Sequence, residues 1–237
     1  MTQKKILILL FMACWNLVVF SQNHSQLDSL YTPKLTGDIF VEKKYEGSPF
    51  VTPEWTKSSI VLNTGDTIIG EKIKYNGYLD EVIWLNPSNF KRFKLDKANI
   101  AEFWIQPEGD QSIHYKQIFV PIASDNQKIF LETTYEGNLA LYIYRKIKRT
   151  GMVIKRDNDI LYELEILTPK DIYFFKLPDG RWMEMHKLRM RYFLKYFPEH
   201  KKAIVQLAKK NHLDFSSEDQ CIELTHLIDQ EILTTNK

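Results

Sequence analysis

Short segments in which apolar and polar residues alternate, separated by turn signals, run from residue 58 to residue 187. A period of two is typical of half-buried β-strands, and turn residues at short intervals favour antiparallel hairpins. Examples are Asn63-Thr64-Gly65-Asp66, between two such segments, and Asn76-Gly77, which follows Tyr75. We therefore predict a mainly β domain over residues 58–187, built as an antiparallel, hairpin-rich sheet that forms a sandwich or an open barrel.

The clearest hairpin surrounds a predicted three-residue loop, Glu136-Gly137-Asn138. This loop would place Tyr135 opposite Leu139 and would make one face of the hairpin almost wholly apolar. Tyr142 and Tyr144 would then lie on the other, more mixed face. The pattern thus predicts two tyrosines on a face that is only partly covered.

After residue 187 the spacing of apolar residues changes to 3.6, which predicts a tail of two or three short helices over residues 188–237. Ser217, followed by Gln220 three residues later, has the spacing of a capping box. Because short amphipathic helices need a partner surface, we expect this tail to pack on the β domain. The predicted buried face of the last helix consists of Cys221, Leu224, Thr225, Ile228 and Ile232.

Residues 1–21 have the pattern of a cleaved export signal, with two early lysines, an apolar run and a small residue at the end. The run Ile6–Phe20 would span about 22 Å as a helix, which is shorter than the ~30 Å hydrocarbon core of a bilayer. A lipoprotein signal ending at Cys14 is an alternative, but the apolar run continues beyond that cysteine. We predict cleavage after Ser21, a location in the periplasm or cell envelope, and an extended N-terminal arm over residues 22–57.

Removal of the signal would leave 30 basic and 30 acidic residues, because Lys4 and Lys5 are its only charged residues. A chain without net charge has no electrostatic basis for binding nucleic acid, so we predict no nucleic-acid partner. Cys221 would remain as the single cysteine, which excludes an intramolecular disulfide. The apolar core must therefore stabilise the domain.

The sequence lacks the motifs of several common catalytic and metal sites, namely a Gly-rich phosphate loop, G-x-S-x-G, H-E-x-x-H and paired C-x-x-C. None of the six histidines has the spacing of a metal ligand. Asp157-Asn158-Asp159 begins like a calcium loop, but Leu161 and Tyr162 stand where an acid and a glycine are required. We interpret it as a solvated turn, predict no metal and no cofactor, and do not favour an enzyme.

A periplasmic hydrolase that uses paired carboxylates is the enzymatic alternative, because two carboxyl groups at a suitable separation can hydrolyse glycosides. The local candidates are Asp80-Glu81, Glu132 with Glu136, and Glu163 with Glu165. Closeness along the chain does not show that two carboxylates meet across a cleft. The hydrolase therefore stays a second hypothesis.

Charge is strongly divided within the helical tail. Residues 186–212 contain eight lysines and arginines and one acid, Glu199, whereas residues 213–232 contain six acids and no lysine or arginine. The basic helices could dock on an anionic membrane, or the acidic helix could pack beside them and neutralise them. We favour neutralisation, and membrane docking is a further alternative.

Aromatic residues are abundant, with 14 Phe, 12 Tyr and 5 Trp. Large rings provide apolar contact area for sugars and for partner proteins. We predict four binding residues on the strands: Trp84, Trp104, Tyr142 and Tyr144. Burial beneath the arm or the helical tail would explain the same residues without a ligand.

Two hairpins resemble a module of many uncharacterised exported bacterial proteins, in which a GDTIxG hairpin precedes a YEGxLxLY hairpin. The matching residues here are Asp66-Thr67-Ile68-Ile69-Gly70 and the segment from Tyr135 to Tyr142, and the resemblance covers roughly residues 58–144. It implies a β-rich envelope protein without a known reaction. We therefore predict a non-catalytic exported envelope protein that binds a protein or glycan partner.

Overall fold

The computed structural model describes residues 34–107, 111–123, 128–215 and 217–233. The predicted export signal lies outside these described residues, and the predicted arm is described only from residue 34. From Leu35 onward the described residues form one structural unit. No helix within them is both long and apolar enough to cross a membrane.

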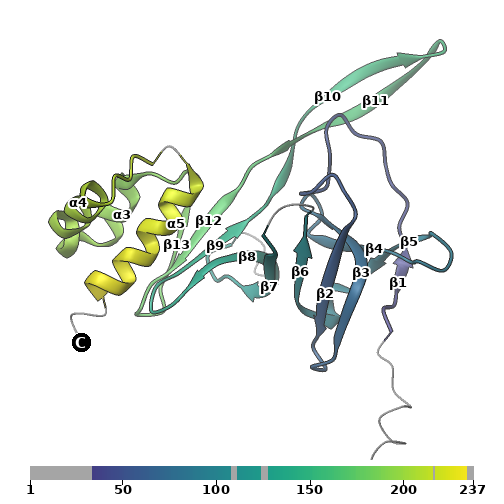
Figure 1. The fold of residues 1–237 in the computed structure, drawn as a ribbon. Helices are drawn as coiled ribbons and strands as arrows, with labels where there is room; N and C mark the ends of the chain where they lie inside the picture. The colour runs from purple at the N-terminus through teal and green to yellow at the C-terminus, as the bar shows by residue number, and fades with distance from the viewer. Residues whose placement is uncertain (1–33, 108–110, 124–127, 216, 234–237) are drawn as a thin grey trace, which may run out of the picture. The chain divides into compact units, whose positions relative to one another are not determined.

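Eleven antiparallel strands form one sheet in the order β1-β5-β4-β3-β2-β6-β7-β8-β9-β12-β13 (Figure 1). Most neighbours are consecutive along the chain, as expected for hairpins. The predicted mainly β, antiparallel fold with a short helical tail is confirmed, and the sheet stays open because β1 and β13 form its edges. The strands of this sheet are β1 (Gly37–Ile39), β2 (Thr56–Leu62), β3 (Thr67–Asn76), β4 (Glu81–Leu85), β5 (Arg92–Leu95), β6 (Ile100–Gln106), β7 (Ile113–Phe119), β8 (Lys128–Glu136), β9 (Ala140–Tyr144), β12 (Ile172–Lys176) and β13 (Trp182–Met185).

Apolar clusters cover both faces of the sheet. On one face, Tyr75, Phe103, Tyr115 and Phe130 are fully buried, and the rings of Phe103 and Tyr115 stack at 4.9 Å. Leu131 follows Phe130 in β8 and therefore points to the opposite face, where it joins a cluster on β8, β9 and β12. The β-domain is thus stabilised from both sides.

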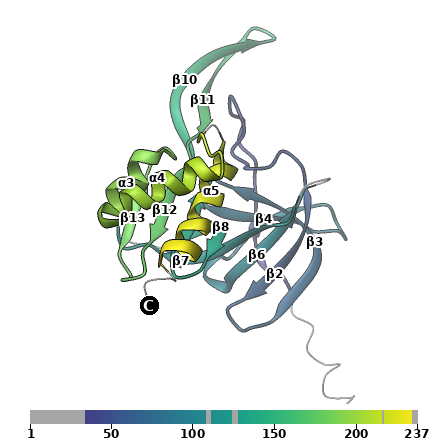
Figure 2. The same cartoon turned by 60° about the vertical axis from the view of Figure 1, so that its left-hand side comes forward.

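A third apolar cluster lies between β9, β12 and the helical tail (Figure 2). One half of the predicted capping box is present, because the Ser217 hydroxyl accepts a hydrogen bond from the Gln220 N–H at 3.4 Å, whereas the Gln220 Oε1 accepts from the N–H groups of Asp214 and Phe215. All five residues predicted for the buried face of the last helix are buried. The tail consists of α3 (Met190–Tyr196), α4 (Lys201–Lys210), α5 (Glu218–Leu227) and a π-helical turn (Ile228–Leu233); short 3-10 turns occupy Lys97–Asn99 and Pro198–His200.

The predicted register of the β8–β9 hairpin is wrong. Tyr135 pairs with Leu141 and not with Leu139, because Glu136 pairs with Ala140 and the loop consists of residues 137–139; a bulge between Thr133 and Tyr135 shifts the pairing again farther along the hairpin. Asp229 of the π-helical turn accepts hydrogen bonds from the Tyr135 hydroxyl at 2.8 Å and from the Asn138 N–H at 2.9 Å. A contact from the far end of the chain therefore holds this loop, which local turn preferences do not reveal.

β10 (Ile147–Asp157) and β11 (Ile160–Pro169) form a separate two-stranded ribbon that extends beyond the large sheet (Figures 1 and 2). Asn158 and Asp159 connect the strands, with φ angles of 45° and 64°. Positive φ at both positions is characteristic of the two-residue type I′ turn. The predicted turn is confirmed, but the two strands that flank it were not predicted.

Candidate functional site

The four aromatic residues predicted to bind a partner do not share one surface. Trp84 packs against the cluster that contains Phe103. Trp104 follows Phe103 in β6 and therefore points to the other face of the sheet. Tyr142 and Tyr144 belong to the cluster on β8, β9 and β12 and are only 6% and 8% exposed. These four residues therefore do not form one common binding surface.

Two of these rings interact mainly with neighbours in the sheet. Trp104 stacks on His114 with ring centroids 4.1 Å apart. Tyr142 stacks on Trp182 at 5.6 Å, and its hydroxyl donates to Glu136 at 2.9 Å at the wall of a cavity of about 620 Å³. Burial and the Glu136 carboxylate raise the pKa of Tyr142, so the hydroxyl remains a donor at neutral pH. These contacts account for both rings without a ligand.

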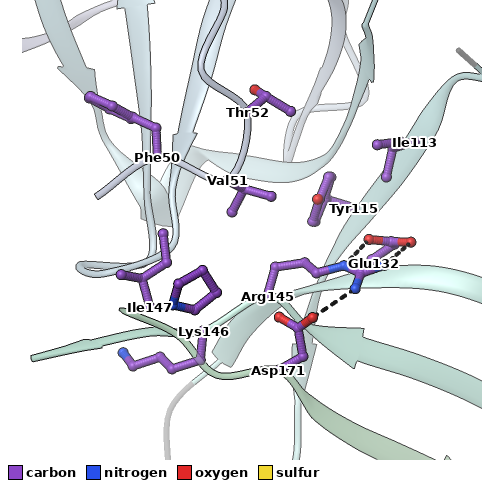
Figure 3. Close-up of a pocket in the computed structure, with 11 residues that line it drawn as sticks. Phe50, Val51, Thr52, Ile113, Tyr115, Glu132, Arg145, Lys146, Ile147 and Asp171 are labelled. Atoms are coloured by element: carbon purple, nitrogen blue, oxygen red, sulfur yellow. Dashed lines mark hydrogen bonds and ion pairs between the residues drawn. The ribbon is translucent and has the colours of Figure 1, made fainter. Parts of the chain in front are cut away.

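A different set of polar side chains converges on Arg145, just after β9 (Figure 3). Both oxygens of Glu132, on β8, accept hydrogen bonds from the guanidinium at 2.7 and 3.0 Å. Both oxygens of Glu218, in the first turn of α5, accept at 2.7 and 3.1 Å, and Asp171 accepts at 2.9 Å. We call these four residues the Arg145 cluster; the Arg145 side chain is 20% exposed.

The Arg145 cluster joins the helical tail to the sheet. Burial alone would lower the pKa of Arg145, but hydrogen bonds to Glu132 and Glu218 outweigh it and raise the pKa above its usual value. Glu218 also accepts a hydrogen bond from the Tyr173 hydroxyl at 2.9 Å. Its position in the first turn of α5 is favourable, because a helix N-terminus attracts negative charge.

A hydrolase needs carboxylates that converge, and the carboxylates of Glu132, Asp171 and Glu218 do converge. Here, however, all three bind the guanidinium of Arg145. A general acid must present its proton to the leaving group. Both oxygens of Glu132 and of Glu218 face the guanidinium instead. The Arg145 cluster is therefore arranged to hold positive charge, and it gives the hydrolase hypothesis little support.

In two of the predicted acid pairs, Asp80-Glu81 and Glu132 with Glu136, the two acids have different partners. Asp80 is buried. It accepts a hydrogen bond from the Tyr75 hydroxyl at 2.6 Å and forms an ion pair with Lys97. Burial is the main cause that raises the pKa of Tyr75 well above its usual value, and the nearby Asp80 carboxylate adds to it. Glu132 binds Arg145, whereas Glu136 contacts Lys116 and Tyr142. Among the described residues, no group of three or more His, Cys, Asp or Glu is arranged to hold a metal ion.

We predict that the Cys221 thiol is unreactive in the folded protein. It is fully buried in the cluster beneath the helices, and burial, assisted by Glu218, raises its pKa to about 11. Because the thiolate is the nucleophile, an aromatic disulfide reagent should label Cys221 at neutral pH only after urea is added. Rapid labelling of the folded protein would contradict this prediction.

The acidic helix does not neutralise the basic part of the tail. Only one ion pair, Lys210 to Glu231 at 3.8 Å, links the two groups among the described residues. The other basic side chains of α3 and α4 are exposed.

Membrane docking of these basic helices has little support, because the apolar stripe of α4, formed by Ile204, Leu207 and Ala208, is buried in the protein. A helix that binds in a membrane interface needs such a stripe free, so only charge supports membrane docking.

The β10–β11 ribbon exposes apolar side chains on one of its faces. Met152, Ile154 and Leu161 are 49%, 65% and 60% exposed, and the strand register places them on the same face. We call these three residues the ribbon patch. The opposite face carries Lys155 and Tyr162, which contact residues 44–46 through an ion pair to Glu46 and a cation–π contact from Lys44. Residues 44–46 thus cover part of that face, although Ile160 at its tip is 68% exposed, whereas the ribbon patch is open apart from the contact of Tyr78 with Glu165 at its base.

The Arg145 cluster and the ribbon patch are the two features that sequence reasoning missed. The ribbon had a usable signal, since Asn158-Asp159 lies between two segments rich in β-branched residues. The Arg145 cluster had none, because its acids come from separate elements. No family model, curated protein or solved structure matches this chain.

Proposed function

We propose that this chain is an exported, non-catalytic binding protein of the cell envelope, and that its β10–β11 ribbon attaches to a partner protein. The ribbon patch is the observation that carries the proposal. Single exposed apolar residues are ordinary, but Met152, Ile154 and Leu161 lie together on one face of a two-stranded ribbon. Two strands alone are marginally stable in water, so a partner that covers this face would also stabilise it.

The charges beside the ribbon patch favour a protein partner. Glu163 lies opposite Ile154 and Arg156 lies opposite Leu161, so charges of both signs alternate with the apolar side chains. This combination of an apolar centre and a polar rim is typical of protein interfaces. A lipid bilayer would instead have to take up the Glu163 carboxylate, which is energetically unfavourable.

The other hypotheses have weaker support. The carboxylates of the Arg145 cluster are held by a guanidinium, which disfavours a hydrolase. A flat glycan platform is disfavoured because Tyr142 and Tyr144 are buried. The predicted export signal supplies the envelope location. Binding through the ribbon therefore fits the described surface best.

The partner can be captured by a photo-reactive amino acid placed at Ile154 in intact cells. We expect one discrete cross-linked protein, and N-terminal sequencing of the same material should begin at Gln22. The matched control is Ile69, which is 76% exposed on β3, outside the ribbon. Equal products from the two positions, or no product from correctly exported protein, would contradict the proposal.

A double variant tests whether the ribbon patch itself supplies the binding energy. Ile154→Glu with Leu161→Glu is expected to weaken binding to the captured protein by at least about tenfold, because central apolar residues dominate such interfaces. The thermal midpoint should change little, since both side chains are mostly exposed. Ile69→Glu should leave binding unchanged. Undiminished binding by the double variant would assign the interface to another surface.

A further inference from the structure

The outer edge of β10 has no neighbouring strand among the described residues, because β10 and β11 form a sheet of only two strands (Figure 1). The edge strands of the large sheet, β1 and β13, are three and four residues long, whereas β10 has eleven residues. Folded proteins usually keep exposed edges short or interrupt them with proline or charge, because an open edge invites another strand. Residues 151–154 of β10 contain neither proline nor charge, so this stretch is an unprotected edge.

The two-residue turn of the ribbon determines which backbone groups of β10 point outward. In a type I′ hairpin the residues on either side of the turn, here Asp157 and Ile160, form a hydrogen-bonded pair. Hydrogen-bonded and non-hydrogen-bonded pairs then alternate along the strands, and the register is unbroken over residues 151–157. The N–H and C=O groups of Met152 and Ile154 therefore point away from β11.

The opposite edge of the ribbon already pairs with another backbone segment. The same alternation directs the backbone groups of Glu165 and Leu167 outward from β11. The Glu46 N–H donates to the Glu165 carbonyl at 2.9 Å, and the Glu46 carbonyl accepts from the Leu167 N–H at 2.8 Å. On the β10 edge, no described backbone group pairs with the outward groups of Met152 and Ile154. The chain thus covers the base of one edge itself and leaves the other edge open.

The charge of β10 favours a strand from a different protein over a second copy of this chain. β10 contains four basic residues and one acid. A second copy of β10 along the open edge would bring two basic strands together, and like charges on facing strands are unfavourable. A strand with an acid beside Arg156 would instead form an ion pair next to the ribbon patch. The open edge therefore fits a strand that combines apolar and acidic residues.

We infer that the partner protein adds an extended strand to the outer edge of β10, with hydrogen bonds to the backbone of Met152 and Ile154 and an acidic side chain beside Arg156. This inference rests on the proposed attachment through the ribbon and specifies how the partner binds. In strand addition, main-chain hydrogen bonds supply affinity and alternate side chains supply specificity. The added strand would also turn a marginally stable ribbon into a three-stranded sheet and extend its apolar face.

Amide hydrogen exchange tests the inference on the complex between this chain and the protein captured at Ile154, purified after its identification. We expect the Met152 and Ile154 amides to exchange at least about 100-fold more slowly in the complex, because their hydrogens enter hydrogen bonds. The matched controls are the amides of Leu161 and Glu163, which point outward from the opposite edge. Their exchange should slow by less than about threefold.

An ester in place of one amide separates the hydrogen bond from the side chain. The α-hydroxy acid analogue of isoleucine at position 154 keeps the side chain and removes the N–H, and it should weaken binding by about tenfold. The α-hydroxy acid analogue of leucine at position 161 removes an outward N–H on the other edge and should leave binding unchanged. Both esters weaken the preceding carbonyl as an acceptor, so their comparison isolates the N–H of Ile154.

The possible results separate this inference from the proposed function. A partner that contacts only the side chains of the ribbon patch would lose binding to the Ile154→Glu, Leu161→Glu variant, but would tolerate the ester at position 154 and protect both edges equally. That result would overturn the inference and leave the proposed function intact. Capture of no protein at Ile154 would contradict both. Protection of Met152 and Ile154 in the isolated chain at high concentration would identify a second copy as the occupant and would also overturn the inference.

Discussion

Replacement of Arg145 by methionine is expected to lower the free energy of unfolding by about 3 kcal/mol, because it leaves three partly buried carboxylates without their cation. Methionine keeps most of the apolar volume of the side chain, so the change removes mainly charge and hydrogen bonds. Glu132 and Glu218 are 13% and 29% exposed, so water can hydrate them only in part. Urea unfolding followed by circular dichroism measures the difference.

Arg149→Met is the matched control for this prediction. Arg149 lies on β10, is 48% exposed and pairs with Glu165 at 3.3 Å. Exposed ion pairs contribute only about 0.2–1 kcal/mol, so this variant should be close to wild type. If the two variants lost the same stability, the Arg145 cluster would be an ordinary surface feature.

A double-mutant cycle separates the contribution of the helical tail. Glu218→Gln removes the charge that α5 brings to Arg145, and the double variant with Arg145→Met isolates the coupling between these two side chains. We expect a favourable coupling of about 1–2 kcal/mol, within the usual range for residues in contact. A coupling near zero would mean that the apolar cluster alone docks the tail.

Features that depend only on residues close together in the sequence were predicted correctly. The Ser217 cap depends on a side chain and a backbone group three residues apart, and both its spacing and its effect are local. The buried face of α5 follows from the helical period alone. The sheet followed from alternation and turn residues, for the same reason.

Features set by distant contacts were not predicted. The β8–β9 hairpin turns at residues 137–139, and Asp229, which is far away along the chain, accepts hydrogen bonds from Tyr135 and from the loop. Glu218 and Arg145 are separated by 73 positions, and no spacing rule connects them. The aromatic candidates failed to group because they lie on different strands and on both faces of the sheet: Trp84 packs with the cluster of Phe103, whereas Tyr142 belongs to the cluster on β8, β9 and β12.

The ribbon escaped prediction for another reason. Sequence patterns reveal strands by the contrast between a buried and an exposed face. In β10 the apolar residues Met152 and Ile154 face solvent. Apolar and polar residues alternate along this strand, but the apolar positions do not indicate a buried face. Places where a sequence breaks the usual rule are often functional, which agrees with the proposed role of this ribbon.

High pH is expected to unfold the protein steeply, because the fold keeps several tyrosines neutral. Burial is the largest cause in each case, and a neighbouring carboxylate adds to it. Tyr135, for example, has its pKa raised to about 12 by burial and by its hydrogen bond to Asp229, compared with about 10 for an unfolded chain. The pKa is raised in the same way for Tyr75, Tyr115, Tyr142 and Tyr173.

The sign of the pH effect follows from proton linkage. When the pKa of a group is higher in the folded state than in the unfolded state, the folded state binds more protons at pH values between the two pKa values. The free energy of unfolding therefore falls as the pH rises through this interval. The contribution from Tyr135 is complete below pH ~10 and is lost between about 10 and 12. Phenolate absorbance and near-ultraviolet circular dichroism should therefore change together in one cooperative step. Tyr135→Phe should make the decline shallower, since one titrating group is removed. Gradual phenolate formation near pH ~10 in protein that keeps its folded signal would contradict this account.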